Sequence, residues 1–262
     1  MQTEKIIDRI VTWLKDYAHN AKVKGFVVGV SGGVDSGVVS TLCAMTGMEV
    51  LVVQMPIRQK ADQVDRASEH IDYLKAKFTN VRGLNIDLTS AFDELTKIFD
   101  ANQPDILHRD LALANTRSRL RMLSLYYYGQ TNALLVCGTG NKVEDFGIGF
   151  YTKYGDGGVD LSPIADLYKT EVYALARALD LPESIKNAIP TDGLWDAERT
   201  DEQQIGATYP ELEKIQKEYG TKTESDYTGR DLEVFKIFDR MHKAAQHKIQ
   251  PIPVCDIPEE WK

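Results

Sequence analysis

Residues 29–36 of this chain, Gly-Val-Ser-Gly-Gly-Val-Asp-Ser, combine small residues, hydroxyl groups and one carboxylate in a spacing that suits phosphate binding. An apolar run over 26–31 leads into this segment, and a helical pattern begins at about residue 35. The two glycines let backbone N–H groups and the helix N-terminus approach anionic oxygens, and the two serines add hydroxyl donors. We therefore predict a phosphate site at a strand-to-helix corner.

Asp35 lies in the first turn of that helix and would repel a phosphate unless a cation lay between them. Mg²⁺ prefers carboxylate and phosphate oxygens, so Asp35 is a candidate magnesium ligand. The alternative is that Asp35 is only an acid favoured at a helix N-terminus. The segment has neither the Gly-Lys-Ser/Thr of a Walker A loop nor the Gly-x-Gly-x-x-Gly spacing of dinucleotide-binding folds.

Composition limits the classes of protein that fit. The 262 residues, 43% of them apolar, are enough for one sizeable domain over 1–262. A net charge of −8 argues against a nucleic-acid partner, because phosphate backbones are bound by clustered Lys and Arg. Cys43, Cys137 and Cys255 lack disulfide or zinc spacing, which indicates a reducing compartment. With no signal peptide and no apolar run of about 18 residues, we expect a cytoplasmic protein with no membrane partner.

Alternating strand and helix patterns must place this corner within a larger sheet. An amphipathic first helix carries Ile7, Ile10 and Leu14 at helical spacing, with Thr3 as its possible N-cap. The rest of the first half alternates between strands at 26–31, 49–54, 81–87 and 133–137 and helices at about 35–46, 60–78, 89–100 and 107–128. This order predicts an α/β fold, an open and mostly parallel twisted sheet with helices on both faces.

Two further segments are candidates for the same site. Gly138-Thr139-Gly140 follows the strand at 133–137, and ligands of open α/β sheets bind at the carboxyl ends of strands. Residues 144–160 contain five glycines and little periodicity, which predicts a mobile loop that could close over a ligand; slack at the surface is the alternative. Helices at 169–179, 209–219 and 230–247 complete the expected chain.

The Ser-Gly-Gly-x-Asp-Ser corner resembles the PP-loop of the ATP pyrophosphatase superfamily, whose members cleave ATP to AMP and pyrophosphate. Several motifs then occur in the order found in the ammonia-dependent NAD synthetase family, which the chain resembles from about residue 4 to 261. They are Ser31 to Ser36, Asn115 with Arg119-Leu120-Arg121-Met122, Gly138-Thr139, Tyr151-Thr152-Lys153-Tyr154-Gly155-Asp156-Gly157-Gly158, Pro190-Thr191 and His247-Lys248. The resemblance implies a Rossmann-like sheet of the adenine nucleotide alpha hydrolase type.

The resemblance also implies a role for particular residues. It assigns ATP, as co-substrate, to Gly29, Val30, Ser31, Gly32, Gly33, Val34, Asp35, Ser36, Thr139, Lys169 and Thr191. It assigns Mg²⁺ to Asp35 and Glu144. It assigns deamido-NAD to Arg119, Lys153, Asp160, His247 and Lys248. In the family some of these groups come from a neighbouring subunit, so a homodimer is implied.

The implied reaction is the amidation of deamido-NAD by ammonia, the last step of NAD biosynthesis. The pyridine carboxylate attacks the α-phosphorus of ATP, pyrophosphate leaves, and ammonia displaces AMP from the acyl-adenylate. The length leaves no room for a glutaminase module, so free ammonia is the expected donor. One departure concerns residues 138–144, Gly-Thr-Gly-Asn-Lys-Val-Glu, where many members have Gly-Thr-Asp-His-Ala-Ala-Glu.

Other interpretations stay open at this point. One is another ATP pyrophosphatase such as GMP synthetase, asparagine synthetase or a tRNA-modifying enzyme, and another is an adenine-nucleotide sensor without activity. Lys169 and Glu144 could also be surface charges, and His247-Lys248 a solvated helix end.

Overall fold

The computed structural model describes residues 1–102, 107–191, 193–194 and 200–262. Its sheet contains four parallel strands in the order β3-β2-β1-β4. The strands are β1 (Gly25–Gly29), β2 (Glu49–Gln54), β3 (Val81–Asn85) and β4 (Leu134–Cys137). The chain moves outward from β1 to β3 and then returns to place β4 on the other side of β1. Ligands of such sheets bind where the order reverses, here at the carboxyl ends of β1 and β4.

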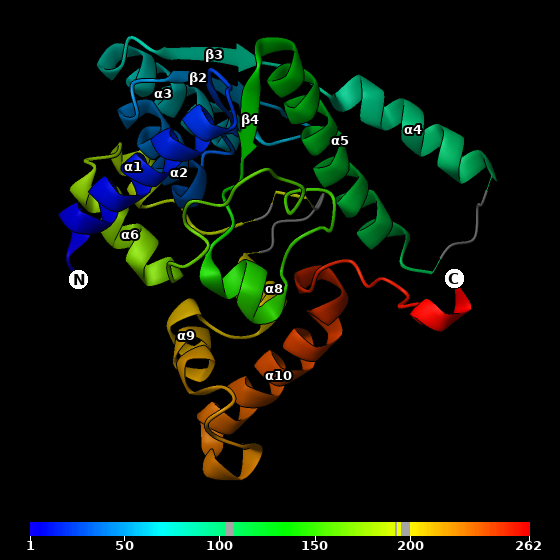
Figure 1. The fold of residues 1–262 in the computed structure, drawn as a ribbon. Coiled ribbons are helices and arrows are strands. Elements are labelled where there is room, and N and C mark those ends of the chain that lie inside the picture. Colours follow the sequence, from blue (N-terminus) through cyan, green and yellow to red (C-terminus); the bar gives the residue numbers. More distant parts are fainter. Residues whose placement is uncertain (103–106, 192, 195–199) are drawn as a thin grey trace.

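Helices surround this sheet and continue beyond it (Figure 1). The α-helices are α1 (Thr3–Asn20), α2 (Val34–Met45), α3 (Ala61–Lys77), α4 (Thr89–Asn102), α5 (Arg109–Asn132), α6 (Lys169–Ala178), α7 (Glu183–Lys186), α8 (Asp201–Ile205), α9 (Tyr209–Glu218) and α10 (Gly229–Ile249). A π-helix, η1 (Lys142–Ile148), follows β4, and two 3₁₀ turns, η2 (Glu224–Asp226) and η3 (Glu259–Trp261), lie near the end of the chain. None of the described helices is long and apolar enough to cross a lipid bilayer.

The two faces of the sheet are covered by different helices. Side chains alternate along β1, so Phe26 and Val28 pack into the cluster formed with α1, α2, α3 and α6. Val27 points to the opposite face, where Leu125 and Tyr128 of α5 cover the sheet. These contacts confirm the predicted parallel sheet with helices on both faces.

A separate apolar cluster holds the C-terminal helices together. Leu212 and Ile215 of α9 and Phe238 of α10 are buried against Val143 and Ile148 of η1. Figure 1 shows α9 and α10 extending away from the sheet. The segment that follows β4 therefore lies between this helical pair and the carboxyl edge of the sheet.

The predicted strands and long helices are confirmed, with differences at several boundaries. Thr3 is not the N-cap of α1: it is the first helical residue, Gln2 precedes it, and no described side chain caps the helix. Regular structure in β1 ends at Gly29, because the next residues already turn toward α2. The predicted loop at 144–160 is wrong for its first residues, since η1 continues to Ile148.

Candidate active site

The corner between β1 and α2 is shaped by its own hydroxyl groups. Ser31 and Ser36 lie 3.2 Å apart through their Oγ atoms, Ser36 Oγ donates to the Gly33 carbonyl at 3.0 Å, and Gly33 N–H donates to Ser31 Oγ at 3.2 Å. Gly33 is the N-cap of α2, and no described side chain occupies that helix end. The first N–H groups of α2 therefore face outward, as an anion site requires.

Gly32 is needed at this corner for two reasons. Its φ of +85° is a conformation that side chains rarely adopt, and a Cβ there would approach the backbone of Gln63 and Ala67 at 3.1 Å. Helix α3 is thus packed directly against the corner.

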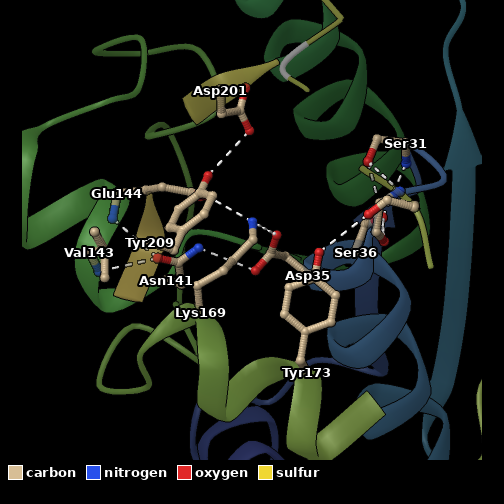
Figure 2. Close-up of polar contacts among 12 residues, drawn as sticks. Ser31, Asp35, Ser36, Asn141, Val143, Glu144, Lys169, Tyr173, Asp201 and Tyr209 are labelled. Carbon is tan, nitrogen blue, oxygen red and sulfur yellow. Dashed lines mark hydrogen bonds and ion pairs between the residues drawn. The ribbon is translucent and has the colours of Figure 1, made fainter. Parts of the chain in front are cut away.

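Lys169, the first residue of α6, joins two carboxylates at the centre of the site (Figure 2). Its Nζ donates to Asp35 Oδ2 at 2.5 Å and to Glu144 Oε1 at 2.9 Å. The side chain of Lys169 is 4% exposed, and those of Asp35 and Glu144 are 16% and 15% exposed. Three elements that are far apart in sequence, α2, η1 and α6, are therefore connected by one buried ammonium.

Two residues absent from the sequence prediction hold these carboxylates in place. Asn141 donates to Asp35 Oδ1 at 3.2 Å, and its Oδ1 accepts from the N–H groups of Val143 and Glu144 at 3.1 Å, so it also begins η1. Tyr209 Oη lies 2.5 Å from Glu144 Oε1 and 3.2 Å from Asp201 Oδ2 (Figure 2). Asn141 is two residues from the predicted Thr139 and could have been found from that position. Nothing in the sequence around Tyr209 indicates its role.

The pKa values of Asp35, Glu144 and Lys169 are shifted in different directions by their shared surroundings. Burial and the nearby Glu144 raise the pKa of Asp35, although Lys169 opposes this. Burial acts on Glu144 as well, but Lys169 and the bond from Tyr209 outweigh it and lower the pKa of Glu144. Burial disfavours the Lys169 ammonium, yet the two carboxylates raise its pKa, so Lys169 stays positively charged.

Two further carboxylates face the same cavity. Burial and the neighbouring carboxylates raise the pKa of Asp145 well above its ordinary value. Burial also raises the pKa of Asp156, against bonds from Ser118 Oγ at 2.6 Å and Thr152 N–H at 3.0 Å. Gly140 leaves room for this arrangement, because a Cβ there would overlap the Asp145 carboxylate.

The predicted ATP residues all lie together. A single cavity is lined by residues 29–36 and by Thr139, Lys169 and Thr191, with Glu144 at its wall. Residues from α3, from α5 and from the glycine-rich segment (residues 144–160) complete its lining, among them Gln63, Arg121 and Asp156. The sequence indicated the loops that follow β1 and β4, but it did not indicate that residues of α3 and α5 line the same cavity.

The residues predicted for deamido-NAD lie outside that cavity lining. Four of them adjoin one another: Arg119 donates to the Lys153 carbonyl at 3.3 Å, Lys153 Nζ donates to the His247 carbonyl at 2.5 Å, and Lys248 Nζ donates to the Gly149 and Tyr151 carbonyls. Lys248 therefore fastens the glycine-rich segment to α10. Burial lowers the pKa of Lys248.

Asp160 has a different setting. Its Oδ2 accepts from the Val136 N–H at 2.8 Å, and its Oδ1 accepts from Tyr126 Oη at 3.1 Å. These bonds attach the end of the glycine-rich segment to the edge strand β4. In this structure Asp160 is thus a link between the sheet and α5.

The donor set at the centre fits Mg²⁺. Asp35 and Glu144 present carboxylate oxygens toward the phosphate corner, and Mg²⁺ is commonly held by one or two carboxylates together with substrate phosphates. Among the described residues no three His, Cys, Asp or Glu side chains are arranged so that they could hold a metal ion together. The arrangement therefore suits an ion shared with a phosphate rather than an ion held by protein alone.

Comparison with known proteins gives consistent results. The family model described as NAD synthase matches residues 6–252. A curated relative from Finegoldia magna, an NH(3)-dependent NAD(+) synthetase, is 34% identical over 249 residues, which cover 95% of this chain and 94% of the relative.

Two solved structures share the fold over nearly the full chain. The NMN synthetase from Francisella tularensis is 28% identical with a TM-score of 0.85, covering 98% of this chain and 100% of its own. The NH3-dependent NAD synthetase from Campylobacter jejuni, solved with a nitrate ion, is 25% identical with a TM-score of 0.78 and the same coverage.

Proposed function

The chain belongs to the NAD synthase family, and from this premise we propose how its site carries out the reaction. The protein is an ATP-consuming ligase that forms a C–N bond in ammonia-dependent NAD synthesis. The observation that carries the assignment to this site is the placement of Lys169, Asp35 and Glu144 beside the β1–α2 corner.

The corner binds the polyphosphate of ATP in this proposal. The N–H groups at the start of α2 and the hydroxyl groups of Ser31 and Ser36 surround the anionic oxygens. Thr139 and Thr191 contact the nucleotide from the other walls of the same cavity. Fixed donors of this kind favour the charge that develops on the leaving pyrophosphate, because they need no reorganisation during the reaction.

The chemical steps need no protein nucleophile. The pyridine carboxylate of deamido-NAD attacks the α-phosphorus, the bond to the bridging oxygen breaks, and pyrophosphate leaves. Ammonia then attacks the acyl carbon of the adenylate and AMP leaves. Lys169 keeps Asp35 and Glu144 oriented, so the chain contributes mainly placement and charge.

We propose Asp35 and Glu144 as the residues that hold Mg²⁺. When bound, the ion supplies positive charge to the phosphate oxygens. Support comes from the position of both carboxylates on the wall of the cavity that the corner lines.

The second substrate is proposed to use Arg119, Lys153, Asp160, His247 and Lys248. Four of these adjoin one another where α5, the glycine-rich segment and the end of α10 meet. They lie beyond the lining of the ATP cavity, which supports a separate subsite for the nucleotide half of deamido-NAD.

We further propose that residues 1–262 work as one domain and assemble as a homodimer. Leu123 and Tyr127, one turn apart on α5, are each 62% exposed and form an apolar row suited to a second copy. A cytoplasmic location is supported by Cys43 and Cys137, whose Sγ atoms lie 3.6 Å apart as free thiols.

A second candidate reaction is the same amidation on a mononucleotide, giving NMN. The observation that favours it is the TM-score of 0.85 to the Francisella NMN synthetase, against 0.78 to the Campylobacter NAD synthetase. Comparing kcat/KM for deamido-NAD and for nicotinic acid mononucleotide, with equal ATP and ammonium, distinguishes the two. A preference for the mononucleotide would favour the second candidate.

The main proposal is tested by the products of a single reaction mixture. Purified protein with ATP, Mg²⁺, ammonium and deamido-NAD is expected to form NAD, AMP and pyrophosphate in equal amounts. Omitting ammonium should stop NAD formation. Release of ADP and orthophosphate would contradict the proposal, because it would place the cleaved bond at the terminal phosphate.

A further inference from the structure

Arg66 of α3 lies beside the phosphate corner. A Cβ on Gly32 would approach the Arg66 Cβ at 3.2 Å, so the arginine side chain begins next to the loop itself. Arg66 also lines the cavity that contains residues 29–36. Its position follows from the close packing of α3 on the corner.

The guanidinium of Arg66 has donors that are not used within the described chain. Its Nη1 donates to Asp62 Oδ2 at 2.9 Å, one helical turn earlier. Its Nε is buried and has no partner among the described residues. A buried donor without a partner is costly, and an arginine offers five N–H groups in a planar fork. The site is therefore incomplete as it stands.

The pairing of the cationic side chains, rather than the net charge of the cavity, points to an anionic ligand for Arg66. Among the described residues, three cationic side chains line the cavity: Arg66, Arg121 and Lys169. Lys169 is joined to Asp35 and Glu144, and Arg121 donates to the Met55 carbonyl and to Gln59. Within the part of the chain that the structure describes, Arg66 is paired only with Asp62, whose side chain is 65% exposed to solvent and so contributes weakly.

We propose that Arg66 binds the β- and γ-phosphates of ATP and the pyrophosphate released from them. The assignment rests on the proposed function, because it takes these anions as the ligands of the β1–α2 corner. The planar guanidinium matches two phosphate oxygens at once, which an ammonium does not. Asp62 accepts only from Nη1, and the proposal assigns the remaining N–H groups of the guanidinium to the phosphate oxygens.

Direct binding to the full-length protein tests this assignment without requiring turnover. Calorimetry with inorganic pyrophosphate and with ATP, each with magnesium, compares the wild type with Arg66→Ala and Arg66→Lys. We expect Arg66→Ala to weaken both ligands about tenfold to a hundredfold, the range for loss of charged hydrogen bonds. Arg66→Lys should lie between, because it keeps the charge and loses the fork. The KM for deamido-NAD should stay within about twofold.

Two matched variants separate ligand binding from a structural ion pair. Asp62→Asn removes the charged partner of Arg66 but keeps the arginine. Lys75→Ala removes a lysine of the same helix that pairs with Asp72, one turn away. Both should bind pyrophosphate with nearly wild-type affinity. The proposal is overturned if Asp62→Asn weakens binding as much as Arg66→Ala does, or if Arg66→Ala binds as the wild type.

If Arg66→Ala does not fold, as thermal unfolding would show, Arg66→Lys carries the test. Its affinity for pyrophosphate should then be at least about threefold below wild type, and equal affinity would overturn the assignment. A wild type that binds pyrophosphate and ATP but makes neither NAD nor NMN would contradict the proposed function and leave the Arg66 assignment standing.

Discussion

The Lys169 ammonium lies 2.5 Å from the Asp35 carboxylate, although 134 residues separate them in the chain. Glu144 accepts from the same ammonium, so α2, η1 and α6 meet at one nitrogen. Removing a partner from such a buried group leaves charge uncompensated. This contact therefore serves both the stability of the fold and the placement of the two carboxylates proposed to hold Mg²⁺.

Lys169→Met should damage both properties. Two buried carboxylates would lose their shared cation, so we expect about 3 kcal/mol less stability and at least about a hundredfold lower kcat. Urea unfolding and initial rates measure the two effects. Lys142→Met is the control, because Lys142 pairs with the exposed Asp166 and should cost under about 1 kcal/mol. Similar results for both variants would contradict the central role of Lys169.

Asp35→Asn should separate activity from folding. Asparagine keeps the size of the side chain but removes the charge expected to face Mg²⁺, so kcat should fall by about a hundredfold or more. Thermal unfolding should change less than in Lys169→Met, because Glu144 still pairs with Lys169. Rates measured across a magnesium series should show a raised requirement for the ion. Asp72→Asn, on the exposed side of α3, is the matched control. Unchanged turnover in Asp35→Asn would remove the metal role.

Gly140 and Asp145 should be energetically coupled. A methyl group at residue 140 would overlap the Asp145 carboxylate, and Gly140 does not have a positive φ, so crowding is the main effect. We expect Gly140→Ala to cost about 1 to 3 kcal/mol of stability. Adding Asp145→Ala should recover most of that loss in a double-mutant cycle. If the two stability losses simply add in the double variant, the contact between residues 140 and 145 is not the cause of the loss in Gly140→Ala.

His70 should make stability depend on pH. It is buried between α2 and α3, Ser40 Oγ lies 2.9 Å from its Nε2, and burial lowers its pKa to about 4. Below pH 6.5 His70 binds a proton in the unfolded chain but stays neutral in the folded chain, so the free energy of unfolding falls as pH falls. The loss between pH 7 and pH 5.5 should be about 1 kcal/mol.

Urea unfolding at several pH values measures this loss. His70→Gln should flatten the dependence in that range, whereas His19→Gln, at the exposed end of α1, should not. An unchanged slope in His70→Gln would exclude His70 as the group responsible.

The proposed dimer should depend on the exposed row of α5. Leu123→Glu places a charge at a side-chain position that is 62% exposed here, where an interface core would exclude it. We expect the mass in solution to fall from two chains to one, as light scattering would show. Tyr17→Glu, on α1, is the control and should leave the mass unchanged. A monomeric wild type would contradict the dimer.

The fold was predicted correctly, and the strand-to-helix corner lies where it was expected, because both depend on local patterns. The backbone at residue 32 has a positive φ, which favours glycine. The alternation of side chains along each strand indicates which residues lie on which face of the sheet. The predicted position of Thr139 followed from the rule that strand ends bind ligands, and the cavity lining confirms that it lies there. The π-helix was not predicted, because its start depends on Asn141 bonding to two backbone N–H groups.

The sequence alone determined that a parallel α/β sheet would present a glycine- and serine-rich turn at a strand-to-helix corner, since neighbouring residues set those features. Only the tertiary structure decided that Lys169 pairs with both Asp35 and Glu144, that Tyr209 supports Glu144, and that Arg66 stands beside Gly32. Such contacts join residues far apart in the chain, and their energies depend on burial and distance, which exist only once the chain has folded.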